Sequence, residues 1–203
     1  MDFTKLGIGN DFAEGEKSLV RRIRFDDMEE MRRMRIIEDD PGVAEFVEDL
    51  QATEEELVRF AKSSENNLCV GVVGKEGCVP QEEVDKLQGW IYFSPDEEER
   101  LFRLKETGLL GGSFDGTVVS EISYAKYPGA SSGQMSSGLR QMIKILKRKC
   151  GDLAEQMILT AYTDTRNENS SRLLTAAGFQ KIGKLDYHVG AERPDDVWIL
   201  RLY

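Results

Sequence analysis

The stretch Asn167-Glu168-Asn169-Ser170-Ser171-Arg172-Leu173-Leu174-Thr175-Ala176-Ala177-Gly178-Phe179 carries the most information about the fold of this chain. It follows an apolar run from Met157 to Tyr162 that is typical of a buried strand. Asn and Ser are preferred at the start of helices, and a glycine often ends them in a left-handed conformation. The stretch therefore predicts a short helix that follows a strand, begins with polar groups and stops at Gly178.

Outward from this helix, apolar runs and alternating patterns predict a series of strands. The predicted strands cover 18–25, 68–73, 87–93, 118–126, 156–163, 179–189 and 197–202. Helical spacing predicts a helix after Asp26, capped by that residue with Glu29 as its reciprocal partner, a second after Thr53, and a third across 139–146. This order of strands and helices predicts an α/β fold with a mixed sheet and flanking helices.

The chain of 203 residues has the size of one domain. Residues 1–17 are rich in glycine and charge, which predicts a flexible N-terminal arm before a single domain over 18–203. Residues 94–116 run from an acidic stretch into closely spaced glycines, which predicts a mobile insertion.

The chain is acidic, with a formal net charge of −10 and a pI of about 4.8. A duplex-binding protein usually carries a basic face or stripe, and the sequence has no such run, so we expect no nucleic-acid partner. An acidic surface attracts cationic partners such as amines, although the charge can equally serve solubility alone.

Cysteine and histidine usage argues against structural cross-links. Cys69, Cys78 and Cys150 have no regular spacing, which fits a reducing compartment, and the single histidine, His188, argues against a zinc site.

Residues 1–17 lack the apolar core of a signal peptide, and no apolar run approaches the roughly 20 residues that a membrane span needs. We therefore expect a cytoplasmic protein with no metal and no membrane contact.

A Ser/Gly loop, Ser131-Ser132-Gly133-Gln134-Met135-Ser136-Ser137-Gly138, leads into the third helix. Backbone N–H groups at a helix N-terminus, together with the helix dipole, suit a phosphate group. Ser/Gly turns before helices are also common without any ligand, so the loop alone does not decide the matter.

The 167–179 stretch resembles the signature helix of the GNAT acyl-CoA N-acyltransferases, which reads Asn-x-x-Ser/Ala, an apolar pair and Gly-Phe. Glu121-Ile122-Ser123-Tyr124 resembles the Glu-Ile-Gly-Tyr run of the Rim-type branch, which is ribosomal-protein N-terminal acetyltransferase-like. The loop aligns with the family's Arg/Gln-x-x-Gly-x-Gly/Ala pattern, with Gln134 in place of its middle glycine, where a side chain can crowd the backbone. The resemblance implies the GNAT fold, whose mostly antiparallel sheet splays open between the strands at 118–126 and 157–163.

The resemblance also implies acetyl-CoA (coenzyme A) as the cofactor, bound in that opening. Asn167 and Ser170 would lie beside its pantetheine, and the backbone amides of Ala125 and Lys126 would face its thioester carbonyl. The predicted pyrophosphate contacts are Gly133, Gln134, Met135, Ser136, Ser137 and Gly138.

Acetyl transfer to an amine needs a proton acceptor, because an alkyl amine with a pKa of ~10.4 arrives protonated. By resemblance, Glu121 would accept this proton, usually through water, and Ser170 would donate a hydrogen bond to the departing thiolate. The tyrosine that many family members use for the second role is absent from the Leu173-Leu174 pair. Without the resemblance, Glu121 is interpreted as a solvated strand residue, and Ser170 as a helix cap.

These features predict an N-acetyltransferase that moves an acetyl group to a primary amine, either a small amine or a peptide N-terminus, by direct attack. Two alternatives remain open at this point: a non-catalytic CoA-binding or sensor protein of the same fold, and an interaction domain that binds no CoA. The sequence does not identify the acceptor, and a homodimer is compatible with it.

Overall fold

The computed structural model describes residues 13–41, 53, 55, 58, 67–96, 98–110, 118–186 and 194–202, and these are the residues discussed below. Their strands form one sheet in the order β1-β2-β3-β4-β5-β6-β8-β7. The strands are β1 Ala13–Glu14, β2 Ser18–Arg21, β3 Leu68–Gly74, β4 Leu87–Pro95, β5 Val118–Lys126, β6 Met157–Asp164, β7 Gln180–Leu185 and β8 Asp195–Arg201. The β5–β6 pair is parallel and the other neighbouring pairs are antiparallel, which confirms the predicted mixed, mostly antiparallel sheet.

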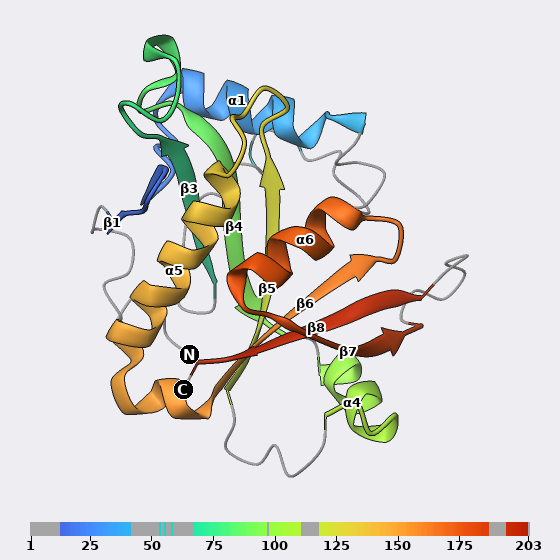
Figure 1. Ribbon diagram of the computed structural model, residues 1–203. Coiled ribbons are helices and arrows are strands. Elements are labelled where there is room, and N and C mark those ends of the chain that lie inside the picture. The colour runs from blue at the N-terminus through green and yellow to red at the C-terminus, as the bar shows by residue number, and fades with distance from the viewer. Residues whose placement is uncertain are drawn as a thin grey trace.

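Helices cover both faces of this sheet (Figure 1). They are α1 Met28–Glu38, α4 Glu98–Glu106, α5 Gln134–Cys150 and α6 Glu168–Ala177, with short 3-10 turns at Gln81–Glu83 and Gly151–Gln156. Alternate side chains of a strand point to opposite faces, and the core follows this rule. On β6, Leu159 and Ala161 pack with α5 and α6, whereas Ile158 and Tyr162 pack with α4. The residues of α1 pack on the same face of the sheet as those of α4, against Trp90 and Ala125.

The sheet splays open in its middle, between β5 and β6. Their parallel pairing begins at Val118 opposite Met157 and ends at Glu121 opposite Thr160. Beyond that point β5 stays paired with β4 as far as Lys126, and β6 stays paired with β8 as far as Asp164. The two strands therefore diverge, as Figure 1 shows, and the predicted opening is confirmed.

Three local predictions need correction. The N-cap of α1 is Asp27 rather than Asp26, because the Asp27 carboxylate accepts the N–H groups of Glu29 and Glu30. Residues 13–14 of the predicted arm pair with β2. Part of the predicted mobile insertion forms α4, because Leu101 and Leu104 lie one helical turn apart and both pack against β6 and β8.

Other predictions fall outside the described residues. These are most of the helix predicted after Thr53, the glycines of the insertion beyond Leu110, and His188. Within the described part of the chain, no helix combines the length and apolarity that a membrane crossing demands.

Candidate active site

The helix α6 begins at the opening between β5 and β6. Asn167 is its N-cap, and the Asn167 side-chain oxygen accepts the Ser170 N–H at 3.0 Å. Gly178 ends the helix with φ 95°, as the sequence predicts, because its left-handed conformation lets its N–H reach the last carbonyls. The two polar residues predicted to face pantetheine are therefore held in place by capping, at the end of α6 that borders the opening.

Tyr124 lies between the two sides of this opening. It extends from β5, and its hydroxyl lies 3.4 Å from the backbone carbonyl oxygen of Ser170 on α6. Burial raises the pKa of Tyr124 to about 12, so the hydroxyl keeps its proton at neutral pH. The opening thus contains a second hydroxyl donor near Ser170.

The predicted phosphate loop forms the N-terminus of α5. Gly133 is the N-cap with φ 83°, and the Gln134 side chain is fully buried, with its Nε2 atom 3.4 Å from the Cys78 carbonyl oxygen. The side chain that replaces the family's glycine therefore turns into the protein, and does not crowd the outer face of the loop.

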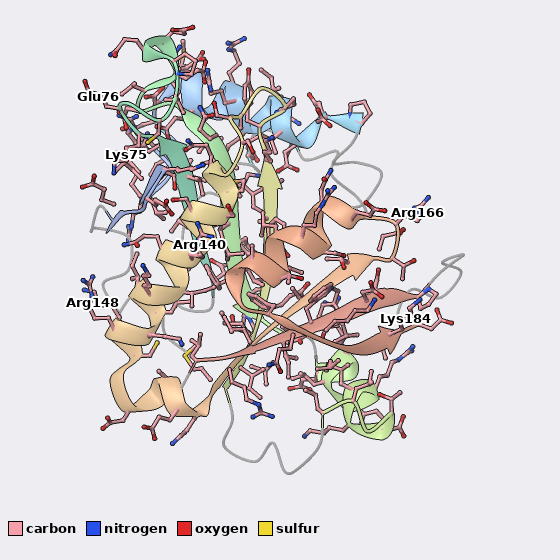
Figure 2. All side chains as sticks on the ribbon, in the orientation of Figure 1. Lys75, Glu76, Arg140, Arg148, Arg166 and Lys184 are labelled. Atoms are coloured by element: carbon pink, nitrogen blue, oxygen red, sulfur yellow. The ribbon has the colours of Figure 1, made fainter. Side chains whose placement is uncertain are left out.

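The β1–β2 turn packs against this helix start and brings a cation to it. The Lys17 N–H donates to the Ser137 hydroxyl at 2.9 Å, and the Lys17 ammonium lies 3.4 Å from where a Cβ on Gly133 would stand. Ion pairs of Glu14 with Lys75 and of Glu16 with Arg140 flank the turn. Figure 2 labels the two basic residues, Lys75 and Arg140. A positive side chain and a helix N-terminus together favour an anion at this place.

The end of β5 directs one backbone amide into the opening. The Tyr127 N–H donates to the Gln88 carbonyl at 2.8 Å, so this N–H points toward β4. The N–H of Ala125, two residues earlier, points the same way. Alternation along an antiparallel strand then turns the Lys126 N–H away from β4, toward the side where β6 has diverged. Of the two amides predicted to face the thioester carbonyl, only that of Lys126 has the required direction.

Glu121 stands where the β5–β6 pairing ends, on the face of the sheet that α1 and α4 cover. Its Oε2 atom lies 2.7 Å from Nη1 of Arg100, which comes from α4. The Arg100 guanidinium also stacks on the Tyr162 ring at 4.3 Å. Ser170 lies on the opposite face, so the structure puts the predicted proton acceptor and the predicted hydrogen-bond donor on two sides of the opening.

Behind Glu121, a buried carboxylate joins β6 to α4. The Asp96 Oδ2 atom accepts hydrogen bonds from the hydroxyls of Thr160 and Tyr162, both at 2.7 Å. Burial and the neighbouring Asp96 charge hold the pKa of Tyr162 far above its usual value, so this hydroxyl remains a donor. The sequence did not indicate this cluster, because its members come from two distant segments and form no motif.

Tyr162→Phe is expected to lower the free energy of unfolding by about 1.5–3 kcal/mol, because it removes a hydrogen bond to a buried charged group. Urea unfolding followed by circular dichroism measures the change. Tyr124→Phe is the matched control, since its longer contact with a neutral carbonyl should cost only about 0.5–1.5 kcal/mol. If the two variants lose the same free energy of unfolding, the hydrogen bond from Tyr162 to Asp96 stabilises the protein no more than an ordinary neutral hydrogen bond does.

Comparisons with known proteins support this description of the fold. The GNAT-family acetyltransferase from Bacillus anthracis has a TM-score of 0.65 and 18% identity, over 95% of this chain and 99% of its own. A ribosomal-protein-alanine acetyltransferase from Vibrio fischeri has a TM-score of 0.62 and 16% identity, over 94% and 96%. RimL, a ribosomal-protein α-N-acetyltransferase in complex with coenzyme A, has a TM-score of 0.63 and 10% identity, over 94% and 98%. The chain has the GNAT fold.

The GNAT likeness is one of structure rather than of sequence. No protein-family model matches the chain, and no curated protein matches it. AAC(6')-Ib in complex with paromomycin and acetyl-CoA shares the GNAT fold at 11% identity and a TM-score of 0.61. The predicted fold is therefore confirmed, and the roles of individual residues have to be argued from this chain's own contacts.

Proposed function

We propose that this protein is an acetyl-CoA-dependent N-acetyltransferase that acts on a primary amine, either a small amine or a peptide N-terminus. The observation that carries the proposal is the end of β5–β6 pairing at Glu121 and Thr160, bordered by the N-termini of α5 and α6. An opening of this kind can admit an extended thioester arm between two strands. The fold neighbours whose complexes contain coenzyme A or acetyl-CoA support the choice of cofactor.

The cofactor's contacts follow from the same geometry. Its pyrophosphate would lie against residues 133–138 at the start of α5, where Lys17 adds a positive charge. Its pantetheine arm would pass Asn167 and Ser170 at the start of α6. The Lys126 N–H would donate to the thioester carbonyl, and such a donor stabilises the negative charge that develops on oxygen in the transition state.

The reaction would be direct attack of the amine on the thioester carbon. Glu121 would attract the ammonium from the face that α1 and α4 cover and help to remove its proton. The hydroxyls of Ser170 and Tyr124, which lie on the α6 face, would donate to the departing thiolate. A thiolate is a good leaving group, with a pKa of ~8.5, so a hydroxyl donor is sufficient.

Acetyl-CoA is expected to raise the melting temperature of the protein, because a ligand that binds only the folded state stabilises it. At a hundredfold excess over the dissociation constant the gain is ~2.7 kcal/mol, which corresponds to a shift of roughly 5–10 °C for a domain of this size. Differential scanning fluorimetry across an acetyl-CoA titration measures this shift, with coenzyme A as a second ligand and ATP as the control.

The outcome separates the proposed function from its alternatives. A saturable shift with both CoA species, followed by release of free CoA thiol when amines are added, supports the acetyltransferase. A shift without turnover for any amine would leave a CoA-binding or sensor protein. No shift at millimolar acetyl-CoA would contradict both and favour an interaction domain.

A further inference from the structure

Three charged side chains, those of Asp96, Arg100 and Glu121, form a row beside the opening, which we call the charged row. The Nη1 atom of Arg100 contacts both carboxylates, at 2.7 Å from Oε2 of Glu121 and at 3.9 Å from Oδ1 of Asp96. The exposed fraction of the side chain increases along the row, from 0% for Asp96 through 10% for Arg100 to 21% for Glu121. Glu121 is therefore the member of the row that an incoming molecule can contact.

The charged row lies where β5 and β6 separate. Glu121 and Thr160 are the last paired residues of the two strands, and Tyr162 lies two residues further along β6 on the same face as Thr160. The Arg100 guanidinium stacks on the Tyr162 ring at 4.3 Å. Asp96, which directly follows β4, accepts hydrogen bonds from the hydroxyls of Thr160 and Tyr162, both at 2.7 Å. The two residues behind Glu121 are thus fixed to the β6 side of the opening.

Arg100 can restrict the Glu121 carboxylate to one position. Only 8% of Arg100 is exposed, and its guanidinium is held by the Tyr162 ring and by Asp96. The 2.7 Å contact therefore ties Glu121 to a group that cannot move freely. Groups held in the reactive geometry react faster, and a displacement of about 1 Å can cost about 100-fold in rate. Arg100 can thus influence the reaction without touching the substrate.

Asp96 determines the net charge of the row. Arg100 and Glu121 alone would cancel each other, and a neutral pair attracts an ammonium group only weakly. The Asp96 carboxylate adds a second negative charge, so the three residues together carry one net negative charge. Charges interact strongly where water is largely excluded, as it is around these side chains. The row therefore carries the charge that one ammonium group neutralises.

We propose that Arg100 is a positioning residue that holds Glu121 toward the acceptor, and that Asp96 sets the charge that attracts the acceptor in its ammonium form. Glu121 contacts the acceptor, Arg100 places the Glu121 carboxylate, and Asp96 prevents Arg100 from cancelling its charge. The helix α4 thus belongs to the acceptor side of the site. This inference rests on the proposed acetyltransferase function and deepens it.

The two residues should affect different kinetic parameters, measured at saturating acetyl-CoA with spermidine or a tripeptide with a free N-terminus as the acceptor. Asp96→Asn makes the row neutral, so it should raise the KM for the acceptor about 10-fold and change kcat little. Arg100→Met removes the contact that places Glu121, so it should lower kcat about 10-fold without raising that KM. Arg100→Lys keeps the charge and should recover part of the lost kcat. If Asp96→Asn and Arg100→Met lose the same kcat with KM unchanged, the two residues share a structural role and the proposal is overturned.

Two double variants test the separate roles. If Arg100 acts through Glu121, Arg100→Met with Glu121→Gln should be no slower than Glu121→Gln alone, and losses that multiply would overturn its role. Asp96→Asn with Arg100→Met returns the row to one net negative charge, so KM should return to the wild-type value while kcat stays low. A KM that stays about 10-fold high would overturn the role of Asp96. Because this variant removes both members of a buried ion pair, it gives the answer even if Asp96→Asn alone does not fold.

Controls keep this inference separate from the function on which it rests. Glu98→Gln and Lys105→Met remove exposed charges from the same helix and should leave both kinetic parameters unchanged. The acetyl-CoA melting shift should persist in every variant, which shows that each one folds and binds the cofactor. If the wild type turns over a probe and the substitutions in the row change neither parameter, only this inference fails. If the wild type binds acetyl-CoA but transfers to neither probe nor to other amines, the acetyltransferase function fails, and this inference with it.

Discussion

Glu121→Gln is expected to lower kcat/KM for acetyl transfer by about 100-fold or more while leaving the affinity for acetyl-CoA unchanged. Gln keeps the size of the side chain but removes the negative charge at the point where β5 and β6 separate. The Arg100 guanidinium, 2.7 Å from the carboxylate, would then repel an incoming ammonium instead of being neutralised. Release of CoA thiol measures the rate, and the melting shift with acetyl-CoA measures binding.

A control for loss of charge alone is available on the opposite face of the sheet. Glu168 is an exposed residue in the first turn of α6, and Glu168→Gln removes the same charge without touching Arg100. We expect this variant to keep at least half of the wild-type rate. If both variants lose rate equally, general electrostatic attraction explains the effect; if neither does, Glu121 has no part in the reaction.

The features that the sequence predicted are those encoded by neighbouring residues. Asn167 and Gly178 mark the two ends of α6 because caps depend on local hydrogen bonds, and the structure has both at the predicted positions. The strand at 118–126 has the predicted bounds because it is a continuous run of strand-forming residues that stops before Pro128. The splayed sheet and the fold were implied by the resemblance of the 167–179 stretch to the GNAT signature helix, and the structure has both.

The features that the sequence did not predict depend on contacts between distant segments. Arg100 lies in the stretch that the sequence predicts as a mobile insertion, and no neighbouring residue indicates its pairing with Glu121. Glu38 reads as part of an acidic helix end with Asp39 and Asp40, which is typical of an exposed terminus. Among the described residues, the packing of α1 against Trp90, 52 residues further along the chain, contributes to its burial.

The direction of the Gln134 side chain, which points into the protein, also depends on contacts between distant segments. The family pattern has glycine at this position, where a side chain can crowd the backbone of the phosphate loop. The sequence alone does not show in which direction the Gln134 side chain points. Burial against the β3–β4 connection near Cys78 settles its direction. A departure from a motif can thus leave the outer face of a loop open when the new side chain is buried elsewhere in the fold.

Glu30→Ala is expected to lower the free energy of unfolding by about 3–5 kcal/mol, more than any other single substitution proposed above. Glu30 is 3% exposed and forms an ion pair with Arg21, which is 5% exposed. It also accepts the Arg24 backbone N–H at 2.7 Å and the Arg24 Nε–H at 2.6 Å. Through these contacts it joins α1 to β2 and to the segment between them. Its removal leaves the buried Arg21 charge, among the described residues, with the more distant Asp85 carboxylate as its remaining ion-pair partner.

Two further variants identify the cause of that loss. Glu29→Ala removes the exposed partner of Arg32 and the longer of two carboxylate contacts of Arg33, which keeps Glu83 at 2.8 Å, so it should cost at most about 1 kcal/mol. The double variant Arg21→Met with Glu30→Leu removes both charges, and it should recover most of the stability that Glu30→Ala loses. Urea unfolding measures all three. If the double variant is as unstable as Glu30→Ala, the loss comes from the missing backbone contact to Arg24 rather than from an uncompensated buried charge.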